Sequence, residues 1–142
     1  MFMGQYNHTI DAKGRLIIPS KFREQLGEAF VVTKGNDGCL YVYTNEAWEG
    51  FLVQLKQLPN NKNTRKLVHA FVSNADTVEI DKQGRILVNA DLRAHANVEK
   101  EVVLAGAIDK IEIWDKQRWE EINSDDDLDD ITEQMAELGL SI

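Results

Sequence analysis

The sequence predicts a mainly β protein with helices, of the α+β class, in which one small ββαββ unit occurs twice. The segment at residues 8–19 reads HTIDAKGRLIIP, and residues 78–89 repeat its pattern as VEIDKQGRILVN. Isoleucine, aspartate, glycine and arginine keep their register in the two copies, and three aliphatic residues follow each arginine. Such internal repetition indicates a duplicated supersecondary unit.

The first unit is expected to begin with strands at residues 5–10 and 16–18, joined by a turn at residues 11–14. Asp11 can bond the backbone that follows it, and Gly14 can adopt a positive φ without steric cost. Pro19 and Ser20 predict the start of a short helix that ends at Gly27. Strands at residues 29–33 and 39–43, with a glycine-rich turn between them, complete the unit.

Two helices are expected to link the units. The first is capped by Thr44 or Asn45 and stopped by Pro59, and the second begins at Thr64. The second unit repeats the plan, with strands at 78–80, 86–88, 102–104 and 111–114, a short helix before residue 97 and a turn near Gly106. The predicted division is 5–51 for the first repeat, 52–76 for the linking helices, 77–122 for the second repeat and 123–142 for an acidic C-terminal helix. Residues 123–127 open this last helix, and Gly139 is expected to cap it.

Charge is distributed unevenly along the 142 residues. The formal net charge is -8, yet residues 123–142 hold seven acids and no base, whereas residues 8–24 hold four bases against two acids. Across residues 78–94 three bases face three acids, so the first copy of the motif is the more positive. The single cysteine, Cys39, fits a reducing compartment, and the chain shows neither a secretory leader nor a membrane span. A cytoplasmic protein without a membrane partner is expected.

Arginine is the residue of the repeated motif that turn geometry does not explain. Aspartate and glycine are typical of any tight turn, and a single copy of the motif would be read as a hairpin turn alone. Arg15 and Arg85 follow their glycines in both copies while the neighbouring residues change. Each arginine either braces the loop through its own aspartate or is held toward a partner. Both are compatible, because an oriented guanidinium presents its planar fork to phosphate or guanine.

The run from Ile10 to Gly27 resembles the DNA-binding motif of AbrB-type (SpoVT-AbrB) transition-state regulators. Two such copies, each followed by a helix with a tryptophan (Trp48 and Trp119), resemble the MraZ family of bacterial transcriptional regulators. This resemblance implies a swapped-hairpin AbrB-like β-barrel formed by the two repeats. It also implies a ring-shaped homo-oligomer in the cytoplasm, associated with the nucleoid. Such a ring would bind repeated boxes of double-stranded promoter DNA and repress its own division and cell-wall operon.

The resemblance assigns roles to individual residues. Arg15 is the first candidate for DNA contact, and the other candidates are Lys13, Arg23, Arg85 and Lys82. The loop-orienting residues are expected to be Asp11, Gly14, Asp81 and Gly84. The second copy departs from the pattern, with Asn89 in place of Pro19, so its DNA contact is the less secure of the two. His8 is expected to be a surface residue near the loop.

Other functions fit the residues less well. Two aspartates in two half-barrels could suggest an aspartic protease, but each is followed four residues later by an arginine that keeps it ionised. The three histidines and Cys39 lack metal-ligand spacing, and no phosphate loop, cofactor site or small-molecule site is predicted. The remaining alternative is an antitoxin or adaptor whose acidic tail binds a protein. The tail is more simply an amphipathic helix that packs on its own protein or on a neighbouring subunit, and the Trp48 stripe is core or subunit interface.

Overall fold

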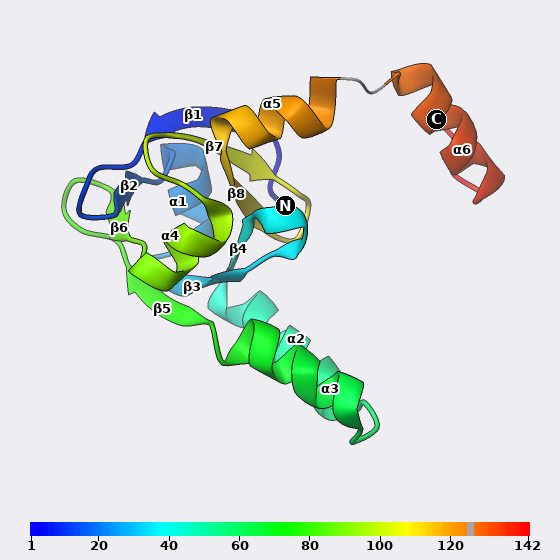
Figure 1. Ribbon diagram of the computed structural model, residues 1–142, viewed down its shortest axis with the longest axis horizontal. Coiled ribbons are helices and arrows are strands. Elements are labelled where there is room, and N and C mark those ends of the chain that lie inside the picture. Colours follow the sequence, from blue (N-terminus) through cyan, green and yellow to red (C-terminus); the bar gives the residue numbers. More distant parts are fainter. Residues whose placement is uncertain (125–126) are drawn as a thin grey trace.

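The computed structural model describes residues 1–124 and 127–142 and contains two ββαββ repeats (Figure 1). The elements of the first repeat are β1 (Gln5–Thr9), β2 (Arg15–Ile17), α1 (Ser20–Leu26), β3 (Ala29–Lys34) and β4 (Leu40–Tyr43). Those of the second are β5 (Asp76–Glu79), β6 (Arg85–Leu87), α4 (Ala90–Ala96), β7 (Glu101–Gly106) and β8 (Ile111–Asp115). The predicted α+β class and the duplication are confirmed. The turn expected near Gly106 lies a little later, because β7 runs to that glycine.

Helices connect and follow the repeats. They are α2 (Asn45–Lys56), α3 (Lys62–Leu67), the π-helical turn η2 (Val68–Val72), α5 (Lys116–Ser124) and α6 (Leu128–Glu137), with a short 3-10 turn η1 (Asn36–Gly38) between β3 and β4. The Thr44 hydroxyl caps α2 by accepting a hydrogen bond from the Ala47 N–H at 3.0 Å. Figure 1 shows α2 and α3 projecting together from the body. We call residues 45–72 the helical arm.

The two repeats exchange strands. The six-stranded sheet has the order β1-β7-β8-β4-β3-β5, so each repeat adds its first strand to the edge of the other repeat's last two strands. The central pair, β4 with β8, also joins the repeats, and all neighbours in this sheet are antiparallel. A separate two-stranded ribbon pairs β2 with β6. Neither repeat could therefore keep its sheet alone, which agrees with the small core that half of this chain could bury.

The predicted local strand–turn–strand unit needs correction. A turn does form at Asp11–Gly14, where the Gly14 N–H donates to the Asp11 carbonyl at 2.9 Å. The strands on either side nevertheless share only the bridge between Ile10 and Leu16, because β1 pairs with β7 and β2 pairs with β6. The hydrophobic pattern indicates which side chains turn inward, but it does not specify the partner strand.

One core lies between the sheet, the ribbon and the helices α1 and α4. Its largest fully buried side chains come from both repeats and include Leu16, Phe22, Phe30, Ile86 and Leu92. Leu16 and Ile86, on the inward face of the β2–β6 ribbon, fix the ribbon to this core. Burial of each such side chain contributes about 1.5–3 kcal/mol, so the ribbon is held firmly against the body.

A second apolar cluster lies on the other side of the sheet, where the helical arm and α5 meet it. It is built around Cys39, Tyr41 and Trp114, with Phe71 and Trp119 packed against it. The Thr33 hydroxyl, which is fully buried, donates to the carbonyl of Phe71 at 2.6 Å and ties η2 to β3. The Trp48 stripe on α2 is partly core, because Leu55 is buried, while Trp48 and Phe51 are half-buried and contact Tyr43.

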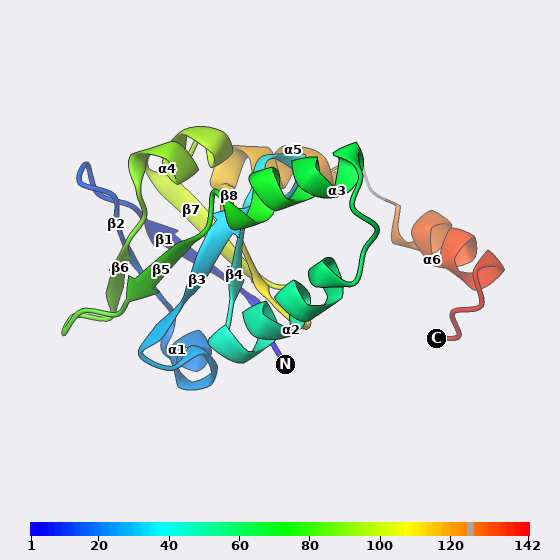
Figure 2. The same cartoon turned by 90° about the horizontal axis from the view of Figure 1, so that it is seen from below.

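The predicted C-terminal helix is confirmed as α6. Asp127 caps it by accepting a hydrogen bond from the Asp129 N–H at 2.9 Å, and Gly139 follows its end with φ +97°. Asp125 and Asp126, which belonged to the predicted start of this helix, lie outside the described residues. The expectation that α6 packs on its own protein is wrong, since none of its residues is buried and both views show it apart from the body (Figure 1, Figure 2). Among the described residues, no helix is long and apolar enough to cross a bilayer.

Candidate nucleic-acid interface

The loop between β1 and β2 is built around the Asp11 carboxylate. Its Oδ1 accepts hydrogen bonds from the backbone N–H groups of Lys13 at 3.0 Å and Arg15 at 2.9 Å. Its Oδ2 accepts a hydrogen bond from the Arg15 side-chain Nε at 2.6 Å. The same carboxylate thus closes the turn and orients the guanidinium that follows it.

The loop between β5 and β6 repeats this arrangement bond for bond. The Oδ1 of Asp81 accepts from the backbone N–H groups of Gln83 at 2.8 Å and Arg85 at 2.9 Å. Its Oδ2 accepts from the Arg85 Nε at 2.9 Å. Since only Nε is used, and no described residue accepts from the terminal Nη atoms of either arginine, both guanidinium forks can take an external acceptor.

Both carboxylates are ionised at neutral pH. The backbone N–H of Arg15 is the largest cause that lowers the pKa of Asp11, its side chain lowers it further, and partial desolvation opposes them. The corresponding bonds from Arg85 lower the pKa of Asp81. Hydrogen bonds to the charged form of a carboxyl have this effect generally. The two Asp–Arg pairs are therefore permanent features of the loops in the physiological range.

Gly14 and Gly84 are required by backbone conformation and by close contact. Their φ values are +89° and +78°, in the left-handed region that side chains avoid. A Cβ on Gly14 would lie 2.6 Å from the Val88 carbonyl oxygen, and one on Gly84 would collide with the Arg23 guanidinium. Each loop is thus pressed against residues of the other repeat.

The β2–β6 ribbon places both arginines on one face. Its register sets Arg15 opposite Leu87 and Ile17 opposite Arg85. Because side chains alternate along a strand, these four residues point outward, while Leu16 and Ile86 between them are buried. Ile17 and Leu87 are exposed, at 42% and 59%. We call this four-residue surface the ribbon face. Figures 1 and 2 show the ribbon and its two loops at one end of the molecule, opposite α6.

Backbone bonds lengthen the ribbon symmetrically at both ends. The Ile18 N–H donates to the Gly84 carbonyl at 2.9 Å, and the Val88 N–H donates to the Gly14 carbonyl at 2.8 Å. Each loop glycine is therefore tied to the strand that leaves the other loop. A displacement of one loop would disturb the other, so the two arginines are held in a fixed relation.

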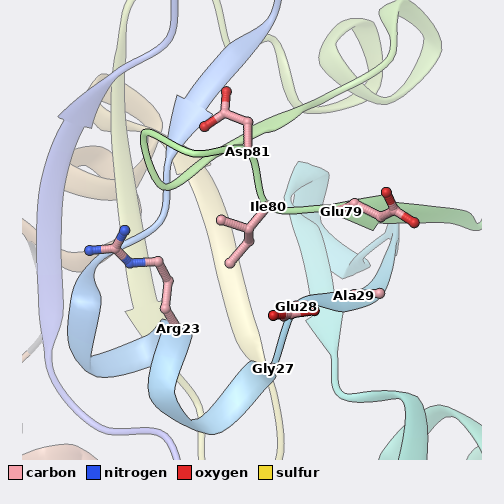
Figure 3. A pocket seen from close by; sticks show the side chains of 7 residues that line it. All are labelled: Arg23, Gly27, Glu28, Ala29, Glu79, Ile80 and Asp81. Carbon is pink, nitrogen blue, oxygen red and sulfur yellow. The ribbon is translucent and has the colours of Figure 1, made fainter.

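Arg23 on α1 and Arg93 on α4 brace the loops from beneath. The Arg93 Nε donates to the Val88 carbonyl at 2.9 Å and lies against Gly14 of the first loop. Arg23 occupies the matching position against Gly84 of the second loop. Figure 3 shows Arg23 reaching from its helix toward the loop that begins at Asp81, at the edge of a cavity of about 600 Å³. Each brace crosses from one repeat to the other.

Arg93 was missed by the sequence reasoning, although a signal was present. It lies seventy residues after Arg23, the offset that relates all the paired residues of the two repeats. The cavity beside it, of about 360 Å³, is the counterpart of the one beside Arg23 and is lined by Asp11 from the first loop. The structure thus brings Arg23 to the second loop and Arg93 to the first, and both are half-buried.

The remaining predicted residues lie at or near the loop tips. Lys13 and Lys82 are exposed, one in each loop, although they occupy different positions of the motif. His8 is half-buried on β1. Each loop therefore combines one oriented arginine with one exposed lysine, which is a basic pattern suited to a phosphate backbone.

Residues suited to other chemistry are not assembled in the described part of the chain. In residues 1–124 and 127–142, no group of three His, Cys, Asp or Glu side chains could hold a metal ion. Burial raises the pKa of the Cys39 thiol to about 12, so it stays protonated and is a poor nucleophile.

Comparison with known proteins decides the family. A family model described as "MraZ protein, putative antitoxin-like" matches the chain twice, at residues 1–70 and 71–139. The chain belongs to the MraZ family. The double match confirms the tandem repeat, and the strand exchange described above gives the structural form that this MraZ duplication takes here.

Curated relatives of the MraZ family cover the chain almost completely. A protein of Lachnoclostridium phytofermentans named transcriptional regulator MraZ is 58% identical over 141 residues, which is 99% of each chain. Proteins of the same name from Alkaliphilus oremlandii and Clostridium tetani are 50% and 49% identical, over 99% of this chain and all of theirs. The family is one of transcriptional regulators, which confirms the expectation that the chain is not an enzyme.

Proposed function

We propose that this MraZ family member is a sequence-specific DNA-binding regulator that contacts duplex DNA through its two Asp-x-x-Gly-Arg loops and the ribbon face. One observation carries the proposal: Arg15 and Arg85 lie on the same outward face of one two-stranded ribbon, each oriented by its own aspartate. A two-stranded antiparallel ribbon fits the major groove of B-DNA, and arginine forks are the commonest readers of guanine there.

The side chains of the interface divide the work by their chemistry. The forks of Arg15 and Arg85 take guanine edges or phosphates, while the flexible ammonium groups of Lys13 and Lys82 take phosphates. Ile17 and Leu87 lie between the arginines and are placed to contact thymine methyl groups. Arg23 and Arg93 support the loops and add positive charge close to the DNA backbone. Asp11, Asp81, Gly14 and Gly84 hold the loops in shape.

The resemblance stated above extends the proposal to assembly and target. The protein would form a ring, in the cytoplasm and on the nucleoid, and repress its own division and cell-wall operon by binding repeated promoter boxes. Several modest contacts on one assembly multiply affinity when the spacing of the boxes matches that of the subunits. The four-part division of the chain at residues 51, 76 and 122 belongs to the same proposal.

Closure of the sheet into an AbrB-like barrel is a further part of the proposal. The edge strands β1 and β5 lead directly into β2 and β6, so the ribbon follows both open edges of the large sheet. The bridge between Ile10 and Leu16 joins the ribbon to β1. A ribbon that covers both edges would also remove exposed edge strands, which are an aggregation hazard.

The test is binding of the pure protein to the DNA upstream of its own operon, measured at two salt concentrations. The wild type is expected to bind this DNA more tightly than unrelated DNA of equal length, and the difference should persist at the higher salt. Non-specific phosphate contacts weaken steeply with salt, whereas base contacts preserve the ratio between sequences. Equal affinity for both DNAs at each salt concentration would contradict the proposal.

A second candidate function is an antitoxin-like adaptor whose acidic tail binds a protein. Two observations favour it: α6 stands off the body with its apolar side chains exposed, and the family description includes the word antitoxin. A protein that lacks residues 125–142 distinguishes the two functions. The DNA-binding proposal expects this truncated protein to keep sequence preference for its promoter, whereas an adaptor would lose its activity with the tail.

A further inference from the structure

The apolar face of α6 is exposed along its length. Leu128, Ile131 and Leu138 are 74%, 39% and 79% exposed, and with Met135 they follow a three-and-four spacing that places them on one side of the helix. A stripe of this kind normally packs against another element. Because no residue of α6 is buried, the element that should cover this stripe is not part of the chain's own body.

The charges of α6 are of one sign. Residues 127–142 contain five acids and no base; the acids are Asp127, Asp129, Asp130, Glu133 and Glu137, and all are exposed. A partner for this helix should therefore offer an apolar strip bordered by bases. Association is faster and more specific when the two surfaces carry opposite charge.

The helical arm offers such a surface. Residues 50–75 contain four bases and no acid; the bases are Lys56, Lys62, Arg65 and Lys66, and all are exposed. Val53 and Leu58 on the arm are 56% and 46% exposed. The ion pairs within residues 1–124 and 127–142 are those of Arg15 and Arg85, so none of these four bases is paired with a carboxylate there.

The two surfaces lie on different sides of one molecule. Figure 1 shows the arm projecting from the body below the sheet, while α6 extends beyond α5 at the other side. Complementary surfaces placed in this way cannot meet within one copy, but they can join successive copies head to tail. A head-to-tail contact closes into a ring when its rotation permits, whereas a two-fold contact between identical surfaces does not produce one.

We propose that α6 of one copy docks on the helical arm of a second copy, apolar stripe to apolar strip and acids to bases. This inference rests on the proposed self-association and specifies which surfaces carry it. It does not depend on DNA binding. The committed occupant of the arm is the tail of a neighbouring subunit; DNA phosphate on the arm, or another protein on α6, are outcomes that the test separates.

The test is a charge-swap series in the full-length protein. The tail variant carries Asp130→Lys, Glu133→Lys and Glu137→Lys, and the arm variant carries Lys62→Glu, Arg65→Glu and Lys66→Glu. The double variant combines both sets. A control variant reverses three exposed acids elsewhere with the substitutions Glu79→Lys, Glu99→Lys and Glu101→Lys. Particle mass is measured by sedimentation over a concentration series, and circular dichroism checks that each variant is folded.

The tail and arm variants should each raise the dissociation constant between copies about tenfold or more, because reversed charges turn attraction into repulsion. The double variant should recover most of the wild-type affinity, since its charges are again complementary. The control should assemble as the wild type does. Wild-type assembly by both the tail and the arm variant would overturn the proposal. So would a double variant that is no better than the single ones.

Cross-linking gives a second measurement that does not depend on charge. A Leu138→Cys chain is mixed with a Val53→Cys chain, and Cys39 stays in place because it is buried. A disulfide between the two different chains is expected. Reduced promoter binding by the arm variant with unchanged particle mass would assign the arm to DNA and contradict docking. Because the Arg15 and Arg85 variants test DNA binding separately, failure of docking would leave the proposed function standing.

Discussion

Arg15 and Arg85 are seventy residues apart in the chain, yet they lie on the same face of one antiparallel ribbon, registered against Leu87 and Ile17. The sequence shows two copies of a loop, of which the first is the more basic. In the folded chain the two loops form a single surface, so the difference in charge applies to two halves of one interface. Both arginines should therefore contribute to the same DNA contact.

Replacement of Asp11 by asparagine should weaken operator binding several-fold. Asparagine has nearly the same shape, but it lacks the charge that orients the Arg15 guanidinium through the 2.6 Å bond to Nε. The loss of one negative charge would by itself strengthen attraction to DNA, so orientation and net charge predict opposite results. Asp81→Asn is the matched variant in the second loop. Tighter operator binding by both variants in a fluorescence anisotropy titration would show that orientation does not matter.

Replacement of Gly14 by alanine should destabilise the fold more than replacement of Gly27. Both glycines have a positive φ, +89° and +79°, and alanine in such a conformation costs about 1–3 kcal/mol. Only at Gly14 would the new Cβ also press on neighbours, the Val88 carbonyl and the Arg93 side chain, since the space at Gly27 is open. Chemical denaturation measures both costs, and equal losses would mean that the contact between loop and neighbouring strand is unimportant.

Replacement of Arg93 by alanine should lower the free energy of unfolding by about 1–2 kcal/mol. The variant loses the hydrogen bond from Nε to the Val88 carbonyl, and a bond from a charged donor contributes about this amount. Arg118→Ala on the exposed side of α5 is the control for size and charge. The Arg93 variant should also weaken operator binding, because it supports the loop that carries Arg15. Behaviour identical to that of the control would remove Arg93 from the interface.

The Asp–Arg pairs should withstand acid well below neutral pH. The pKa values of Asp11 and Asp81 are lowered from an ordinary value of 3.8, so each pair stabilises the folded loop above that pH. The stabilisation is lost only as the pH falls through the lowered pKa values, when the folded carboxylates take up protons. An NMR titration of the carboxyl carbons should place both midpoints below 3.8, with a peptide of residues 8–19 as the unfolded control. Midpoints above that of the peptide would contradict the loop geometry.

Much of the fold could be predicted from local patterns. The turns at Asp11 and Asp81, the cap at Thr44 and the helix stop at Pro59 depend on neighbouring residues, and they appear where such patterns indicate them. The exchange of β1 and β5 between the repeats could not be predicted from the residues, because a strand pattern specifies which side is buried and does not specify a partner.

The interface shows the same limit. Both Asp–Arg pairs were expected as a brace because aspartate and arginine are four residues apart in one turn. The cross-repeat braces of Arg23 and Arg93 were not, since they depend on where α1 and α4 meet the loops of the other repeat. Arg23 was expected near DNA from its charge alone. Its contact with Gly84 assigns it first to the support of a loop.

The most direct test of the central claim is operator binding by the Arg15→Ala, Arg85→Ala and double variants, with Arg118→Ala as the control. Each single variant should lose on the order of 1–3 kcal/mol per contact, compounded across the subunits of an assembly, and the double variant should bind operator and unrelated DNA alike. The control should bind as the wild type does. Undiminished operator binding by the folded double variant would contradict the account.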